Sequence, residues 1–193
     1  MYKLRRKDDS KRKAIFEATI SLLNEIGFYQ ISMSKIAKRA GVSVATIYVY
    51  FEDKDDMIRK LYFYVKNQFV TFTVQDLDST KSVQQNIEHS VRKMLNFILR
   101  NKEYFLFIEQ FLNSPLVQNL SIEDNVEDMK AFYRIFEIGK KDGVLKPVES
   151  ILLMGFCYSP VMDLAKSHFN GNLELSEDVV KSIILMSWDA IKA

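Results

Sequence analysis

Residues 33–51, MSKIAKRAGVSVATIYVYF, constrain the fold of this chain more than any other stretch. Apolar side chains in its first half recur at the spacing i, i+3, i+4, i+7, which places them on one face of a helix: Met33, Ile36, Ala37 and Ala40. Gly41 follows, and glycine is the residue that most readily ends a helix in the left-handed conformation. The pattern predicts a short amphipathic helix that stops at a tight turn.

A second short helix is predicted after this turn, from Val44 to about Phe51. Ser43 stands just before it and can accept a backbone N–H bond as its N-cap. Ile47 and Phe51 share one face, which leaves small, hydroxyl and aromatic groups on the other: Ala45, Thr46, Tyr48 and Val49. Residues 28–51 contain three basic side chains and no acidic one, which suits a surface facing phosphate. An ordinary helical corner in an all-α core is the alternative.

Residues 11–61 as a whole resemble the DNA-binding domain of the TetR family of bacterial transcription regulators. The matching positions are Ile15 to Gly27 as a first helix, Gly27-Phe28 leading to Ser32, Ile36-Ala37, Ala40-Gly41-Val42-Ser43, Ile47-Tyr48, Tyr50-Phe51 and Lys54. Beyond residue 61 only the helical pattern and the length agree with the family. The resemblance implies a DNA reader that needs two copies of the chain to bind successive major grooves of a double-stranded operator.

Family position also implies which side chains contact DNA: Ser32, Lys35, Ser43, Val44, Ala45, Thr46, Tyr48, Val49, Tyr50 and Lys54. Ala45 stands where the family often has glycine, and Tyr50 stands where it often has histidine. The second helix holds no Arg, Asn or Gln, the side chains that most often read bases through paired hydrogen bonds. We therefore expect methyl contacts and DNA shape to carry more of the recognition, with an A·T-rich operator.

Basic residues are also concentrated at the N-terminus, where residues 1–13 hold seven Lys or Arg ahead of any clear apolar period. Such a run is either a solvated terminus or an arm that contacts phosphates or the minor groove, and we favour the arm. Residues 1–60 carry a net charge of +5, so the remainder must carry −3 to give the total of +2. The basic excess lies with the predicted DNA reader.

Several classes of protein are disfavoured by what the sequence lacks. A single cysteine, Cys157, excludes an intrachain disulfide, the charged N-terminus does not look like a secretory signal, and no apolar run is long enough to span a membrane. We therefore expect a cytoplasmic protein. His89 and His168 stand alone, and no zinc-protease, paired-cysteine, dinucleotide-binding or P-loop motif is present. The sequence predicts a non-enzyme without a metal or cofactor.

Helical periodicity continues through the rest of the chain. Helices are predicted over residues 10–26, 54–76, 83–101, 102–113, 122–142, 148–170 and 176–193, and strand-like alternation is absent. The expected fold is all-α with about nine helices. Residues 1–53 are predicted to form the arm and helix-turn-helix domain, and residues 54–193 the ligand-binding and dimerisation domain, with helix 54–76 as the connector. Pro160 predicts a kink or break in its helix.

The middle of the chain is richer in aromatic side chains and methionine than helix packing requires, although any single one is more often core than ligand contact. The family resemblance implies a ligand cavity inside this bundle. Its candidate lining residues are Phe69, Phe97, Tyr104, Phe107, Phe111, Phe132, Tyr133, Phe136, Phe156 and Met162. Such a lining suits a small hydrophobic or amphiphilic effector.

The expected function is that of a ligand-responsive DNA-binding transcription regulator. We expect a homodimer formed through the last two helices, acting as a repressor that leaves a palindromic operator when the effector binds. The apolar residues of those two helices could instead be monomer core. A competing interpretation is a DNA-bound protein-interaction factor of the same fold, such as a cell-division or nucleoid-associated regulator, without a small-molecule effector.

Overall fold

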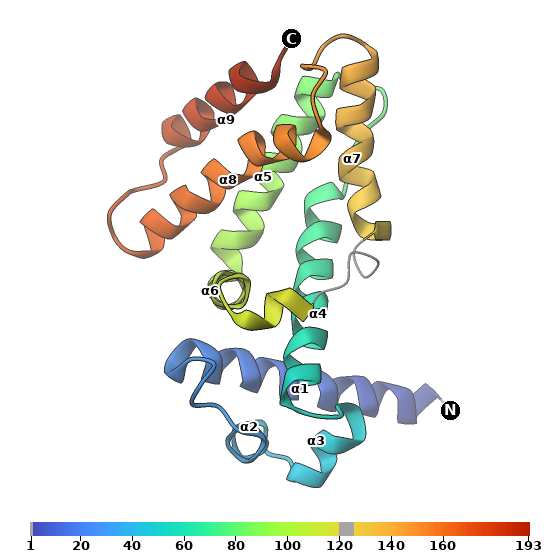
Figure 1. The fold of residues 1–193 in the computed structure, drawn as a ribbon, viewed down its shortest axis with the longest axis vertical. Coiled ribbons are helices and arrows are strands. Elements are labelled where there is room, and N and C mark those ends of the chain that lie inside the picture. The colour runs from blue at the N-terminus through green and yellow to red at the C-terminus, as the bar shows by residue number, and fades with distance from the viewer. Residues whose placement is uncertain (1, 120–125) are drawn as a thin grey trace. The chain divides into compact units, whose positions relative to one another are not determined.

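The computed structural model describes residues 2–119 and 126–193 (Figure 1). Within these residues the chain forms nine α-helices and one short 3₁₀-helix, η1. The elements are α1 Tyr2–Ile26, α2 Met33–Ala40, α3 Val44–Tyr50, α4 Lys54–Val74, α5 Val83–Arg100, α6 Lys102–Leu112, η1 Pro115–Asn119, α7 Val126–Lys141, α8 Ser150–Phe169 and α9 Glu177–Ile191. The predicted all-α fold is confirmed.

Some predicted boundaries differ from the observed ones. Helix α1 begins at Tyr2 and not at residue 10, so the basic N-terminal segment continues the helix. Of the predicted kink or break at Pro160, the break does not occur, because α8 runs through this residue from Ser150 to Phe169. The short helix η1 was not expected. The predicted start of the helix at residue 122 falls outside the described residues, and α7 begins at Val126.

The chain forms two compact units. Unit 1 comprises Met1–Lys66 with Asn101–Leu120, and unit 2 comprises Asn67–Arg100 with Ser121–Ala193. This division differs from the expected one at residue 53, because unit 1 includes the first part of α4 and all of α6. The physical reason is burial, since α4 and α6 add apolar side chains to the same core as the helix-turn-helix.

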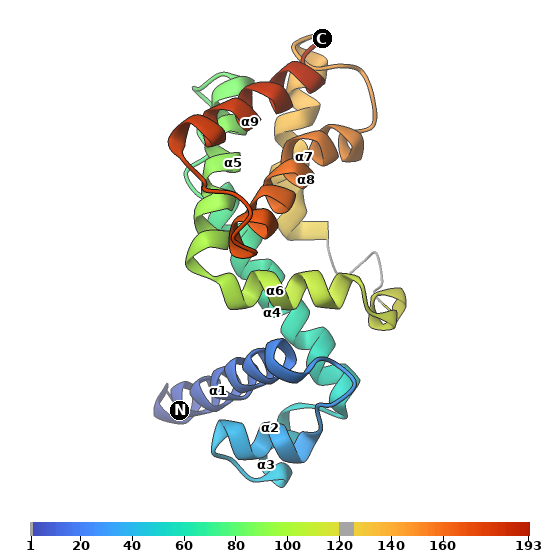
Figure 2. The same cartoon turned by 90° about the vertical axis from the view of Figure 1, so that its left-hand side faces the viewer.

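Unit 1 is built on α1, with α2 and α3 forming the angled pair beside it (Figure 2). Its core joins side chains from five helices: Ile15, Leu23, Ile36, Ile47, Ile58, Leu61, Phe107 and Phe111. The Tyr62 and Phe111 rings stack with centroids 4.4 Å apart, and Asn24 of α1 donates to the backbone oxygen of Glu103 at 3.0 Å. These contacts hold α6 against the scaffold that carries α2 and α3.

Unit 2 is organised around α5, which contacts α7, α8 and α9, while α8 and α9 lie side by side (Figure 2). Its buried centre includes Val91, Met94, Phe136, Cys157, Val161 and Ala165. Ser90 of α5 and Tyr158 of α8 share a hydrogen bond of 2.9 Å, and the rings of Phe132 and Tyr158 pack edge to face with their centroids 5.2 Å apart. Burial raises the pKa of Tyr158, so this hydroxyl stays neutral.

Candidate nucleic-acid interface

The two ends of α2 are fixed by its own neighbours in the sequence. The Ser32 hydroxyl accepts the backbone N–H of Lys35 at 3.3 Å, which makes it the predicted N-cap. Gly41 adopts a left-handed φ of 66°, and the N–H of Val42 returns to the carbonyl of Ala37 at 3.0 Å. The predicted stop at Gly41 is confirmed, and the turn leads directly into α3.

Helix α3 is capped in the same manner. The Ser43 hydroxyl accepts the backbone N–H of Thr46 at 3.1 Å, and the two hydroxyl oxygens of these residues lie 2.9 Å apart. Ile47 is fully buried, and Phe51 is buried at the end of the helix. These anchors leave α3 little freedom to turn about its axis, because its inner face is packed into the core of unit 1.

The outer face of α3 carries side chains that the core does not use. Tyr48 is 54% exposed, Val49 is 77% exposed, and Ala45 is also exposed. Large apolar groups held at the surface of a rigid helix often mark a contact surface. Val44 and Tyr50 are half-buried against the core of unit 1, so they have less surface to offer than family position suggested.

The remaining predicted DNA contacts lie in the same segment. Ser32, Lys35 and Ser43 are exposed, whereas Thr46 and Lys54 are half-buried. All ten predicted residues belong to α2, α3, their caps and the first residue of α4, so unit 1 brings them into one region. Whether each contacts DNA stays a prediction.

The three basic residues between positions 28 and 51 differ in what they contact. Arg39 donates to the Ser21 hydroxyl at 2.7 Å and to the Glu25 carboxylate at 2.6 Å, so it joins α2 to α1. The ammonium group of Lys35 donates to the carbonyl of Gln30 at 2.8 Å. Lys38 is exposed. Because Arg39 is already paired with Glu25, it contributes less to the attraction for phosphate than the sequence suggested.

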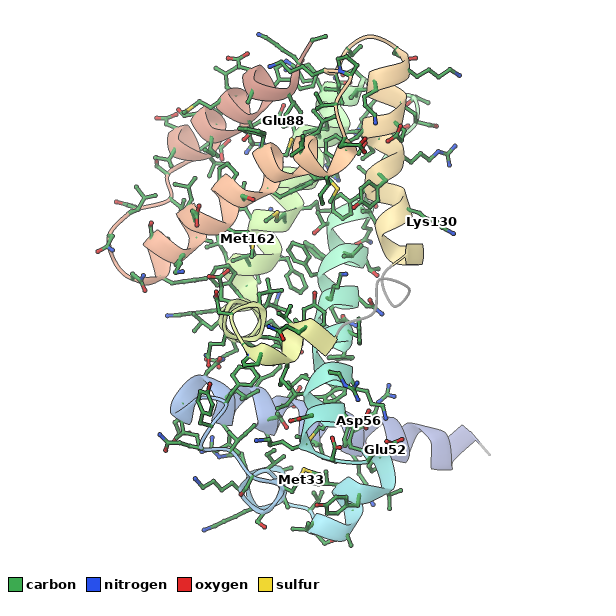
Figure 3. The ribbon with its side chains drawn as sticks, in the orientation of Figure 1. Met33, Glu52, Asp56, Glu88, Lys130 and Met162 are labelled. Atoms are coloured by element: carbon green, nitrogen blue, oxygen red, sulfur yellow. The ribbon has the colours of Figure 1, made fainter. Side chains whose placement is uncertain are left out.

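The junction between α3 and α4 is organised by two aspartates, and Figure 3 shows Asp56 beside Glu52. Asp53 caps α4 by accepting the backbone N–H of Asp56 at 2.7 Å. Asp56 is only 7% exposed, and its carboxylate accepts the N–H of Glu52 at 3.0 Å and the ammonium of Lys60 at 2.8 Å. Burial opposes the charged form, but these hydrogen bonds and the charges of Lys60 and Arg59 outweigh it and lower the pKa of Asp56.

One exposed aromatic residue was missed by the sequence reasoning. Tyr29, in the loop between α1 and α2, is 93% exposed. The available signal was its position three residues before the Ser32 cap, in a segment without helical periodicity. Tyr29 directly precedes Gln30, whose backbone carbonyl accepts a hydrogen bond from the Lys35 ammonium.

The ten predicted ligand-lining residues are divided between the two units. Tyr104, Phe107 and Phe111 belong to unit 1, where Phe107 and Phe111 are fully buried in the core beneath the helix-turn-helix. The pKa of Tyr104 is raised to about 12, first of all by burial. Phe107 and Phe111 were predicted to line a ligand cavity but pack in the core of unit 1, where both rings contact Phe28 of the loop after α1 and Phe111 stacks on Tyr62 of α4. Tyr104 is partly buried against the same core.

The other seven lie in unit 2: Phe69, Phe97, Phe132, Tyr133, Phe136, Phe156 and Met162. Phe69 meets Phe97 edge to face at 5.5 Å, and Phe132 and Phe136 both pack on Tyr158. Phe156 differs from the rest, since it is 59% exposed on α8 and does not fit the expectation of an internal lining residue. It belongs to an exposed apolar face with Ile151 and Leu152 of α8.

Two further observations limit the chemistry of the described part of the chain. None of its helices is long and apolar enough to cross a membrane. No group of three or more His, Cys, Asp or Glu side chains in residues 2–119 and 126–193 could hold a metal ion.

Comparison with known proteins agrees with this geometry. The family model described as bacterial regulatory proteins, tetR family, matches residues 15–61, and the model for a tetracyclin repressor-like C-terminal domain matches residues 84–192. An uncharacterized HTH-type transcriptional regulator of Haemophilus influenzae is 26% identical over 179 residues, which cover 92% of this chain and 94% of that protein. The fatty acid metabolism regulator protein of Bacillus subtilis is 27% identical over 127 residues, covering 60% and 66% respectively.

A solved structure extends the similarity to the whole fold. The crystal structure of a TetR family transcription regulator from Marinobacter aquaeolei has a TM-score of 0.86 and 29% sequence identity, covering 97% of this chain and 98% of that one. Both the helix-turn-helix region and the C-terminal region therefore match the same family. The chain belongs to the TetR family of helix-turn-helix transcriptional regulators.

Proposed function

We propose that this regulator is a homodimeric repressor that binds a palindromic operator through α3 and leaves it when a hydrophobic or amphiphilic small molecule binds in unit 2. The observation that carries the proposal is the outer face of α3, where Tyr48 and Val49 are held exposed between two capped helix ends. Because the caps hold this face of α3 in place, it can dock into a major groove with little loss of conformational entropy.

The chemistry of this face supports groove contact more than paired hydrogen bonding to bases. Ala45 and Val49 offer methyl groups that fit thymine, and Tyr48 offers a ring and a hydroxyl. Ser32 and Lys35 stand at the start of α2, where phosphate contacts would fix the register. Tyr29, exposed in the preceding loop, is a further candidate for the sugar-phosphate backbone. An A·T-rich operator remains the expected preference.

Dimerisation is supported by an exposed apolar face on the last two helices. Ile151, Leu152 and Phe156 of α8 are more than half exposed, as are Leu185 and Met186 of α9. Such side chains are costly to leave in water, so a second copy is a fitting partner. A two-fold dimer would present two α3 helices to half-sites about 34–36 Å apart. Replacing Phe156 by Glu should yield a monomer in light scattering, while Ile138→Glu, at an exposed site on α7, should leave the dimer intact.

The effector class is supported by two independent facts. Unit 2 holds paired aromatic rings around Phe97 and Tyr158, and a relative sharing 27% identity is named a fatty acid metabolism regulator. A long-chain acyl compound is therefore the first class to test. It would release DNA only if it binds the DNA-free conformation more tightly than the DNA-bound one.

The proposal is tested by selecting bound sequences from random DNA and then titrating the complex with effectors. Binding should weaken steeply as salt rises, and the selected sites should be palindromic and rich in A·T. Palmitate or its coenzyme A thioester should release the operator, with hexanoate as the short-chain control. A selected site without two-fold symmetry would refute the dimeric mode, and full retention of DNA by saturating acyl ligand would refute the effector class.

A further inference from the structure

A small pocket lies between α5 and α9 in unit 2, and none of the aromatic pairs described above lines it. Its volume is about 130 Å³. Helix α5 contributes Ile87, Glu88 and Val91, and helix α9 contributes Ile184, Ser187 and Trp188. Figure 3 marks the position of Glu88 on α5. Because Gln84 and Lys181 also line the pocket and are exposed, it is accessible from the surface.

The wall of this pocket contains a polar group that the protein leaves unpaired. Ser187 is only 4% exposed, and its hydroxyl oxygen has no hydrogen-bond partner among the residues that the structure describes. A buried hydroxyl normally both donates and accepts, and leaving it unpaired is unfavourable. Native proteins contain few such groups, so an unpaired hydroxyl beside a pocket indicates a missing partner.

The charges around the pocket favour a neutral partner. Glu88 is already paired with Arg92 at 3.2 Å, and Arg92 also bonds to Glu177 at 2.9 Å. Lys181 contributes one positive charge on the opposite helix. Because positive and negative charges are both present at the rim, the rim does not select an anion or a cation. The inner lining of Ile87, Val91, Ile184 and Trp188 is apolar.

We propose that this pocket is a second binding site, for a compact neutral ligand with one hydroxyl group and a ring about the size of phenol. An apolar cavity of about 150 Å³ accepts benzene, so the volume here suits one such ring. The ring would pack against the Trp188 indole, and its hydroxyl would pair with Ser187. This site is separate from the proposed acyl effector site and does not depend on it. Occupancy would strengthen the contact of α9 with α5.

The chain itself supplies the probe for the test. Trp188 is the only tryptophan in the sequence, so a ¹H–¹⁵N spectrum of the full-length protein contains a single indole signal per chain. Phenol is the ligand actually titrated, and toluene, which has nearly the same shape without the hydroxyl, is its control. Phenol should shift the indole signal in a saturable manner and raise the thermal midpoint.

Two variants separate pocket binding from general contact with the surface. Ser187→Ala should weaken phenol binding about fivefold while leaving toluene binding unchanged, because only phenol has a hydrogen bond to lose. Ile184→Phe, at a half-buried lining position, should fill the pocket and abolish the saturable shift for both ligands without lowering the thermal midpoint. The site would be overturned if phenol did not shift the indole signal, or if the shift did not saturate. An equal shift in the Ile184→Phe protein would also overturn it. Equal phenol affinity in the Ser187→Ala protein would overturn the role of the hydroxyl.

Discussion

Replacement of Asp56 tests how the junction between α3 and α4 is held. Asp56→Ala removes an acceptor for the N–H of Glu52 and for the ammonium of Lys60. Loss of a capping interaction of this kind costs about 1–2 kcal/mol. The Lys60 side chain is 49% exposed, so the ion pair adds only about 0.5 kcal/mol. We therefore expect the free energy of unfolding at neutral pH to fall by about 1.5–2.5 kcal/mol.

Asp56→Asn is the matched control, because its amide oxygen can still accept the N–H of Glu52 but carries no charge. This variant should lose only about 0.5 kcal/mol. The measurement is urea unfolding, followed by circular dichroism, for all three proteins. Equal losses for Asn and Ala would refute the reasoning, since they would mean that charge, and not the backbone cap, stabilises the junction.

The pH dependence follows from the direction of the pKa shift. The folded protein lowers the pKa of Asp56 below its ordinary value of 3.8. The carboxylate therefore contributes its stability above pH 3.8, and this contribution is lost as the pH falls through the folded pKa. The difference between the parent protein and Asp56→Ala should shrink below pH 3.8. The difference between Asp56→Asn and Asp56→Ala should not, because neither residue titrates. A parent-to-Ala difference that stays constant to lower pH would contradict this account.

Three further substitutions test the packing that supports the site. Phe111→Ala should destabilise unit 1 by about 3–5 kcal/mol in urea unfolding, because the ring is fully buried and stacks on Tyr62; a loss below 1 kcal/mol would count against its core role. Gly139→Ala should cost about 1–3 kcal/mol, because the added Cβ would lie 2.5 Å from a methyl carbon of Leu145, and an unchanged thermal midpoint would refute this. Ser43→Ala should cost about 1 kcal/mol through loss of the α3 cap and should weaken DNA binding, with Ser43→Thr retaining most of both.

Local sequence signals predicted the helix-turn-helix well. Ser32, Gly41 and Ser43 determine helix ends through short-range hydrogen bonds and backbone conformation, so their roles could be read without knowledge of the fold. The all-α class followed from periodicity, and the family is one of transcriptional regulators and not of enzymes, in agreement with the prediction. The start of α1 was missed because charged residues hide the helical period.

Roles that depend on packing between distant segments could not be predicted. Phe107 and Phe111 were candidate ligand contacts because the family resemblance implies a cavity in this aromatic-rich part of the chain, yet composition says nothing about which core a ring enters. Phe156 has the same composition signal but is exposed on α8. Arg39 looked available to phosphate until the structure placed it against Ser21 and Glu25 of α1. Each case turns on contacts between residues at least 14 positions apart in sequence or on exposure, which periodicity does not report.

The central claim is that the outer face of α3 and the start of α4 bind DNA, and fluorescence anisotropy on a selected operator tests it most directly. The variant combines Tyr48→Ala with Lys54→Ala, and Leu112→Ala, at an exposed site on α6, is the control. If each contact contributes about 1.4 kcal/mol, the double variant should bind about 100-fold more weakly, with the dimer and thermal midpoint little changed. An operator affinity equal to that of the parent protein would contradict the account.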